Sequence, residues 1–277
     1  MEYEQPTARS ISLWEEDEYP IAHPDDGFRP WLDPYPLETD TALGAVLICP
    51  GGGYGCRARH EGIQIAEAFN RLGLHAFVVH YSVAPRRHPQ PLRDAGRAIR
   101  IIRRRASEWR VDPAHIAILG FSAGGHLAGS LGVHYDKSWL SDPSPFGKFT
   151  ARPDALILCY AVLSSGPFMH AGSFYNLLGP DPDPAFVATM GLENQINDAT
   201  PPAFLWHTAD DSGVPVENSL LFAGVLRRHC VPFELHVFGS GPHGLGLATD
   251  DPHIATWFPL CVQWLTSNNW ISAAKSQ

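Results

Sequence analysis

Apolar runs of strand length alternate with stretches of helical spacing along most of the chain. The predicted strands are 43–49, 74–80, 115–119, 154–160, 203–208 and 233–238. The predicted helices are 64–72, 91–109, 123–134, 215–229 and 252–267. Strands that alternate with helices form a mostly parallel sheet with helices on both faces, so the pattern predicts an α/β fold.

Two kinds of segment depart from this alternation. Residues 1–42 are rich in proline and acidic residues, and we expect an irregular N-terminal arm with short edge strands. No repeat or Ser/Gly-rich linker divides residues 43–277, which predicts a single domain after the arm. Residues 135–152 and 163–202 interrupt the rhythm, and insertions of this length in a compact domain are often lids or binding loops.

The charge balance argues against nucleic acid and anionic membrane surfaces as partners. The chain has 29 Asp and Glu against 20 Lys and Arg, a formal charge of −9. A group of arginines, Arg100 and 103–105, resembles a basic patch, but in an acidic protein we expect a solvated helix face.

Nothing in the sequence predicts export or a membrane span. The N-terminal residues lack a basic segment followed by an apolar one, and no apolar run has the length of a membrane helix. The five cysteines form no C-x-x-C pair, and Cys49 and Cys159 lie in apolar strand-like runs typical of a core. We therefore expect a cytoplasmic protein, and the sequence gives no basis for an oligomeric state.

A G-x-S-x-G sequence at 120–124 follows a predicted strand and opens a predicted helix. In this setting the sequence predicts a nucleophile elbow, a tight turn that exposes the serine oxygen above the sheet. The candidate nucleophile is Ser122. Elsewhere the same sequence would be only a flexible turn, so the interpretation needs an acid, a base and oxyanion donors.

Candidates for the acid and the base follow the last two predicted strands. Asp210 and Asp211 come directly after strand 203–208, where a carboxylate could orient a histidine, and one of them could instead be a turn former or helix cap. Among 14 histidines, His243 stands out because it lies in a glycine-rich loop after strand 233–238. The order Ser122, Asp, His243 is that of α/β-hydrolases.

The loop after the first core strand contains three consecutive glycines, 51–53, followed by Tyr54. Glycines allow backbone N–H groups to approach a developing oxyanion without obstruction by side chains. The N–H of Ala123, the residue after the candidate nucleophile, would be a further donor. His126, just beyond the elbow, could line the pocket, although packing within its own helix is the simpler interpretation.

Other sites do not fit these residues. A phosphate loop would need a lysine after its glycines, and residues 51–56 do not supply a clean dinucleotide fingerprint. A zinc site is disfavoured because no H-E-x-x-H or paired Cys/His spacing occurs. We predict neither a cofactor nor a metal.

With these motifs in place, roughly residues 40–267 resemble the α/β-hydrolase superfamily. Within it the chain is similar to bacterial esterases and lipases related to acetyl-xylan esterases and to carboxylesterases of the hormone-sensitive-lipase type. The segments that carry the resemblance are 49–54, 81–85, 120–128, 211–215 and 242–244. The resemblance implies the α/β-hydrolase fold, with a mostly parallel central sheet covered on both faces.

The resemblance also implies roles for individual residues. Ser122 would be the nucleophile and His243 the base. The family's acid usually stands three residues before Val-Pro, which favours Asp211 over Asp210. The oxyanion donors would be Gly52, Gly53 and Ala123. Apart from the resemblance, the places of Tyr54 and His126 beside these loops make them our candidates for contact with substrate.

One departure bears on the substrate. The hormone-sensitive-lipase group usually has histidine before its glycine triplet, whereas this chain has Pro50, which favours esterases of sugar esters. We therefore expect a serine carboxylesterase acting on short acyl esters, above all acetyl esters of sugars or xylo-oligosaccharides. The rivals are a feruloyl esterase, arylformamidase or peptidase with the same triad, and a non-catalytic binding protein on this fold.

Overall fold

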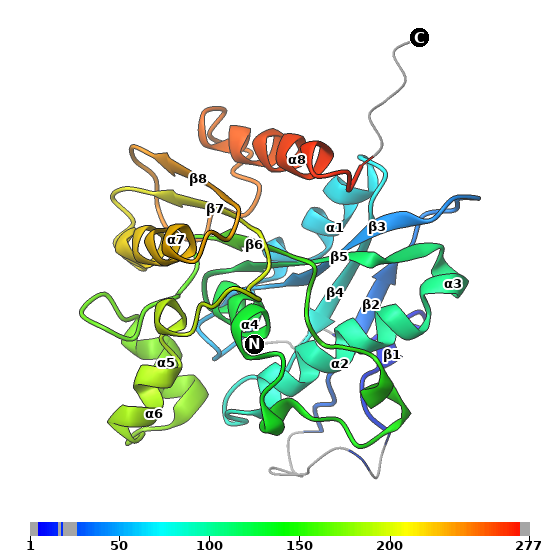
Figure 1. Cartoon of the computed structure of the whole chain (residues 1–277), viewed down its shortest axis with the longest axis horizontal. Helices are drawn as coiled ribbons and strands as arrows, with labels where there is room; N and C mark the ends of the chain where they lie inside the picture. Colours follow the sequence, from blue (N-terminus) through cyan, green and yellow to red (C-terminus); the bar gives the residue numbers. More distant parts are fainter. Residues whose placement is uncertain (1–4, 16–17, 19–26, 272–277) are drawn as a thin grey trace.

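The structure describes residues 5–15, 18 and 27–271, and these residues form an eight-stranded sheet with helices packed against it (Figure 1). The structure is a computed structural model. The strand order is β1-β2-β4-β3-β5-β6-β7-β8. The strands are β1 (Ile11–Ser12), β2 (Trp31–Tyr35), β3 (Leu43–Cys49), β4 (His75–His80), β5 (Val111–Phe121), β6 (Ala155–Cys159), β7 (Ala203–Thr208) and β8 (Phe233–Phe238).

Strand directions confirm the predicted mostly parallel sheet. The pairs β1/β2 and β2/β4 are antiparallel, and every other neighbouring pair is parallel. β5 is longer than the predicted 115–119 because its first residue, Val111, pairs with Leu43 and its last, Phe121, pairs with Cys159. The sequence pattern predicts the apolar middle of β5. It does not predict the residues at the two ends, which belong to the strand because they pair with β3 and β6.

The helices largely follow the predicted spans. They are α1 (Ile63–Asn70), α2 (Gln90–Arg104), α3 (Ala106–Trp109), α4 (Ser122–His134), α5 (Ala171–Leu178), α6 (Pro184–Thr189), α7 (Glu217–Arg228) and α8 (Trp257–Ser267). The predicted helix 91–109 is divided at Arg105, whose φ of −94° and ψ of 14° end α2. No described helix has the length and apolar character that a membrane crossing requires.

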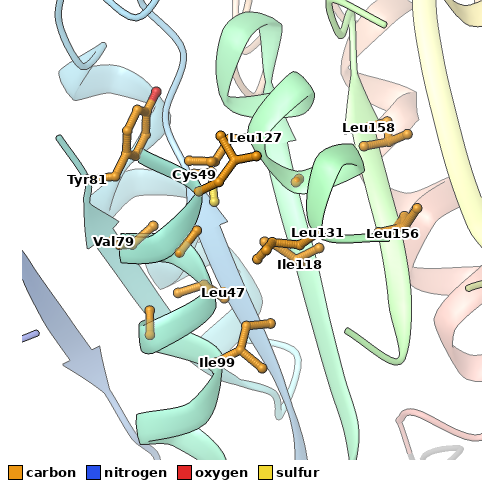
Figure 2. Close-up of a cluster of buried hydrophobic side chains, with 14 of the residues drawn as sticks. Leu47, Cys49, Val79, Tyr81, Ile99, Ile118, Leu127, Leu131, Leu156 and Leu158 are labelled. Carbon is orange, nitrogen blue, oxygen red and sulfur yellow. The ribbon is translucent and has the colours of Figure 1, made fainter. Parts of the chain in front are cut away.

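Two apolar layers sandwich the sheet, as expected. Alternate residues of β3 face opposite sides: Leu47 joins the layer under α2, α4 and α7, whereas Val46 joins the layer under α1 and α8. Figure 2 shows the first layer, where Leu127 of α4 lies near Cys49 at the end of β3. Cys159 is also fully buried, in agreement with its predicted place in the core.

The N-terminal residues contribute to the sheet. β2 pairs along five positions with β4, and β1 extends the sheet beyond it. After β1, the Trp14 Nε1–H donates to Asp94 Oδ1 (2.8 Å), which ties this segment to α2. The predicted short edge strands are therefore present.

Two of the four arginines predicted to form a solvated face, Arg100 and Arg103, are instead largely buried, whereas Arg104 is exposed as expected. The Arg100 guanidinium donates to the carbonyls of Phe149 (3.1 Å) and Leu140 (3.0 Å), and Arg103 pairs with Asp154 at 2.6 Å. These arginines fasten the insertion at 135–152 and the start of β6 to the helix. Because these partners lie 40 to 51 residues further along the chain, the sequence pattern does not reveal the contacts.

Candidate active site

Ser122 lies at the junction of β5 and α4, in a turn whose backbone is left-handed. Its φ is +52°, a conformation that non-glycine residues rarely adopt and that is typical of strained functional turns. Glycines make the turn possible: a Cβ on Gly120 would lie 2.0 Å from the Gly124 carbonyl oxygen, and one on Gly124 would lie 2.1 Å from the Cys49 oxygen. The structure thus contains the strand–turn–helix geometry of the predicted elbow.

Three side chains from three different loops form a continuous hydrogen-bond chain. The Ser122 hydroxyl lies 2.8 Å from His243 Nε2, and His243 Nδ1 lies 2.7 Å from Asp211 Oδ2. With the Nδ1–H donating to the carboxylate, Nε2 is free to accept the serine proton. The structure therefore brings together the three residues that the sequence selects.

Asp211 is a strongly stabilised carboxylate. Its Oδ1 accepts the N–H groups of Gly213 (2.8 Å) and Val214 (2.9 Å), and His207 Nε2 lies 3.5 Å from Oδ2. Burial acts to raise the pKa of Asp211, but hydrogen bonds from His207, His243 and the backbone outweigh it and hold this pKa well below its usual range. The carboxylate is thus charged at neutral pH and fixed in orientation.

The neighbouring Asp210 has a different position. Its carboxylate is exposed, and it accepts the Ser240 hydroxyl (2.6 Å) and the Gly241 N–H (2.7 Å). Asp210 therefore shapes the loop that precedes His243, whereas Asp211 contacts the imidazole itself. The geometry favours Asp211 as the acid.

The glycine loop after β3 lies against the serine. A Cβ on Gly51 would be 3.1 Å from Ser122 Cβ, and the φ angles of Gly52 (+121°) and Gly53 (+63°) are positive. Gly52 is also sterically obligatory, since a Cβ there would lie 2.4 Å from the Cys56 oxygen. The loop needs both the conformational freedom and the small size of glycine.

The N-terminus of α4 lies beside this loop and has no side-chain cap. The helix begins at Ser122. Uncapped amides at a helix N-terminus carry partial positive charge and are suited to bind an anion. The N–H of Ala123 belongs to this turn, so its position is compatible with the predicted oxyanion donor.

Tyr54 and His126 contact one another in the interior. Their side chains are about 1% exposed, and His126 donates Nε2–H to the Met190 carbonyl (2.9 Å) while its Nδ1 accepts the Tyr54 hydroxyl (2.8 Å). Burial lowers the pKa of His126 to about 4, so the imidazole is neutral. The pair thus links the residue after the glycine triplet to α4 and to Met190, and its contact with substrate stays a prediction.

Contacts that the sequence does not reveal complete the surroundings of the site. Glu61 accepts the Gly51 N–H (2.7 Å) and the Tyr160 hydroxyl (2.6 Å), and Asn176 of α5 donates to the Gly53 carbonyl (2.9 Å). No motif marks these residues. The one signal for Asn176 is its place in the long insertion at 163–202, predicted as a lid.

A polar side chain of the same insertion lies near the triad. His170 caps α5, with Nδ1 accepting the Ser173 N–H at 3.2 Å. Its pKa is lowered, first by burial and then by the charge of His243. His170 is therefore a neutral imidazole at the edge of the site.

A cavity of about 350 Å³ lies between the start of β2 and the segment that follows β4. Its lining includes Phe28, Trp31, Arg57, Val83 and Ala84, but not the triad. The triad therefore lies outside this cavity. Within the described ranges, no group of three His, Cys, Asp or Glu side chains is arranged to hold a metal ion.

Comparisons with known proteins agree with this geometry. The BD-FAE family profile matches residues 34–226. A solved structure, the acetyl ester-xyloside bifunctional hydrolase from Caldicellulosiruptor lactoaceticus, is 46% identical, with a TM-score of 0.92 over 96% of this chain and 98% of that one.

Two curated relatives are longer proteins. The endo-1,4-beta-xylanase B of Butyrivibrio fibrisolvens is 41% identical over 87% of this chain, and the acetylxylan esterase of Xylanibacter ruminicola is 32% identical over 83%. The aligned regions cover 38% and 45% of those proteins, so the chain spans less than half the length of either.

The chain belongs to the BD-FAE family of α/β-hydrolase esterases, since the profile covers more than half of its residues. The predicted α/β-hydrolase fold and the predicted carboxylic ester hydrolase are thereby confirmed.

Replacement of Gly124 by alanine should disrupt the elbow. The new Cβ would collide with backbone oxygens at 2.1 Å and 2.5 Å, so we expect a loss of about 3 kcal/mol or more in the free energy of unfolding, measured by chemical denaturation. Gly224→Ala in α7 is the matched control. Nothing lies within 4 Å of its Cβ, and helix propensity predicts a gain of about 0.5–1 kcal/mol. Equal effects of the two substitutions would contradict the packing argument.

Substitution of the two aspartates should separate their roles. In Asp211→Asn the remaining oxygen should stay with the Gly213 and Val214 N–H groups, so the amide NH2 faces His243 Nδ1 and favours the wrong tautomer. We expect kcat for p-nitrophenyl acetate to fall by about 10⁴-fold. Asp210→Asn leaves the His243–Asp211 contact in place, and we expect a loss of less than about tenfold. If Asp210→Asn had the larger effect in folded protein, the assignment of the acid to Asp211 would be wrong.

Proposed function

We propose that this chain is a serine esterase that removes acetyl groups from acetylated xylo-oligosaccharides through an acyl-enzyme on Ser122. The observation that carries the proposal is the unbroken chain of hydrogen bonds from Asp211 through His243 to Ser122, at 2.7 Å and 2.8 Å. The family and the fold make ester hydrolysis the reaction, and this chain of contacts supplies the nucleophile.

In the first half of the reaction His243 Nε2 takes the proton from the Ser122 hydroxyl as its oxygen attacks the ester carbonyl. Asp211 stabilises the imidazolium that forms. The N–H groups of Gly52, Gly53 and Ala123 stabilise the negative charge on the former carbonyl oxygen. His243 then returns the proton to the departing alcohol, which leaves an acetyl-enzyme.

In the second half water replaces the alcohol. His243 removes a proton from the water, hydroxide adds to the acetyl-enzyme carbonyl, and the same donors stabilise the second oxyanion. Collapse of this intermediate returns the proton from His243 to Ser122 and releases acetate. The neutral enzyme is regenerated without a cofactor.

The choice of substrate rests on the relatives. One is described as an acetylxylan esterase and another as an acetyl ester-xyloside hydrolase, at 32% and 46% identity. Pro50 before the glycine triplet agrees with this choice. An acetyl group also demands little space around Ser122, whose side chain is 7% exposed.

Hydrolysis of p-nitrophenyl acetate, butyrate, octanoate and ferulate by wild type and Ser122→Ala tests the proposal. We expect the acetate to be preferred and kcat to fall by about 10⁴-fold or more in Ser122→Ala. Release of acetate from peracetylated xylobiose then tests the sugar. A preference for ferulate or octanoate would overturn the substrate, and turnover that survives Ser122→Ala would overturn the mechanism.

A further inference from the structure

Glu61 is a buried acid that the proposed mechanism does not use. It ends a 3₁₀ turn (Arg59–Glu61) between the glycine loop and α1, and it is 2% exposed. Both carboxylate oxygens accept short hydrogen bonds: Oε2 from the Gly51 N–H (2.7 Å) and Oε1 from the Tyr160 hydroxyl (2.6 Å). A buried carboxylate destabilises the fold unless its oxygens accept hydrogen bonds. Glu61 meets this condition through its contacts with Gly51 and Tyr160.

Tyr160 extends the contact to the loop that carries His243. The residue follows β6 with a φ of +35°, and its hydroxyl accepts the Gly246 N–H at 2.8 Å. Its ring lies edge-on to the His243 ring, with 5.0 Å between the centroids. A second link runs in parallel, since His60 Nε2–H donates to the Gly244 carbonyl at 2.9 Å.

We propose that Glu61 is a positioning residue that joins the oxyanion loop to the histidine loop. On one side its carboxylate fixes Gly51, beside Ser122; on the other it fixes Gly246, three residues after His243, through the Tyr160 hydroxyl. The two loops leave the sheet after β3 and β8, which have three strands between them, and Glu61 sets the spacing of the loops. This inference rests on the proposed function, because it assigns the two loops their catalytic parts.

The contacts are those of an ionised carboxylate. An ionised carboxylate can accept a hydrogen bond at each oxygen, as Glu61 does from Gly51 and Tyr160. A neutral carboxyl group would carry a proton on one oxygen and direct an O–H toward one of these two donors. Burial raises the pKa of Glu61, while Tyr160, Gly51 and the charges of His60 and His243 oppose this rise.

Several titratable groups surround this carboxylate. His60 is on its own turn, Tyr81 follows β4, Cys159 and Tyr160 lie at the end of β6, and His243 is in the loop after β8. Burial raises the pKa values of Tyr81, Cys159 and Tyr160 well above their ordinary ranges, so these three stay neutral during catalysis.

Three substitutions distinguish the loss of the Glu61 contacts from the loss of the contact with Gly246 and from the loss of one negative charge. Glu61→Gln keeps the size of the side chain but can accept from only one of the two donors. Tyr160→Phe keeps the ring beside His243 and removes the hydroxyl that reaches Gly246. Glu67→Gln, on the exposed face of α1, is the matched control for loss of one negative charge.

The experiment measures kcat and KM for p-nitrophenyl acetate from pH 5 to 9 in wild type, the three variants and the Glu61/Tyr160 double variant. We expect Glu61→Gln to lower kcat by about 10–100-fold with KM within about threefold, because geometry rather than binding is lost. The double variant should be no worse than Glu61→Gln, and Glu67→Gln should match wild type.

Thermal unfolding of each variant distinguishes positioning from folding. If Glu61→Gln does not fold, Tyr160→Phe carries the test, with an expected loss of about tenfold in kcat. A folded Glu61→Gln whose loss falls on KM rather than on kcat, or whose loss adds to that of Tyr160→Phe, would reduce Glu61 to a structural residue. Hydrolysis that survives Ser122→Ala would overturn the proposed function itself, whereas Ser122-dependent hydrolysis that Glu61→Gln leaves unchanged would overturn only this inference.

Discussion

The parallel register of the central strands is the constraint on which the site depends. β3, β5, β6, β7 and β8 run in one direction, so their carboxyl ends meet at one edge of the sheet. The glycine loop, Ser122, Tyr160, Asp211 and His243 each follow one of these strands. Five segments that are far apart in the sequence are thereby brought within hydrogen-bond reach, as is typical of ligand sites in open α/β sheets.

Two buried carboxylates maintain this edge in different ways. Asp211 is surrounded by donors that hold its pKa well below the usual range, whereas burial raises the pKa of Glu61 despite its two short hydrogen bonds. The difference follows from the number of donors, because Asp211 accepts from two backbone amides as well as from His243. Asp211 is thus suited to face a developing positive charge, and Glu61 is suited to join two loops.

The sequence predicts those parts that local pattern encodes. β7 and β8 coincide with their predicted runs, and the order Ser122, Asp211, His243 follows from the loops after three strands. Glu61 and Tyr160 are not predictable in this way, because their contact joins positions 99 residues apart and Tyr160 reads as the end of an apolar strand. The burial of Arg100 is not predictable for the same reason, since its partners are carbonyls 40 and 49 residues away.

The local sequence pattern predicts the substrate less well than it predicts the fold or the triad. Tyr54 and His126 are plausible contacts by their place in the sequence, yet both are buried, and they bind each other and the insertion at Met190. Asn176 of the same insertion holds the Gly53 carbonyl. The insertion at 163–202 therefore fixes the glycine loop as well as bordering the site. Changes in it can alter the shape of the oxyanion loop while every triad residue is retained, which gives proteins with one triad a physical route to different esters.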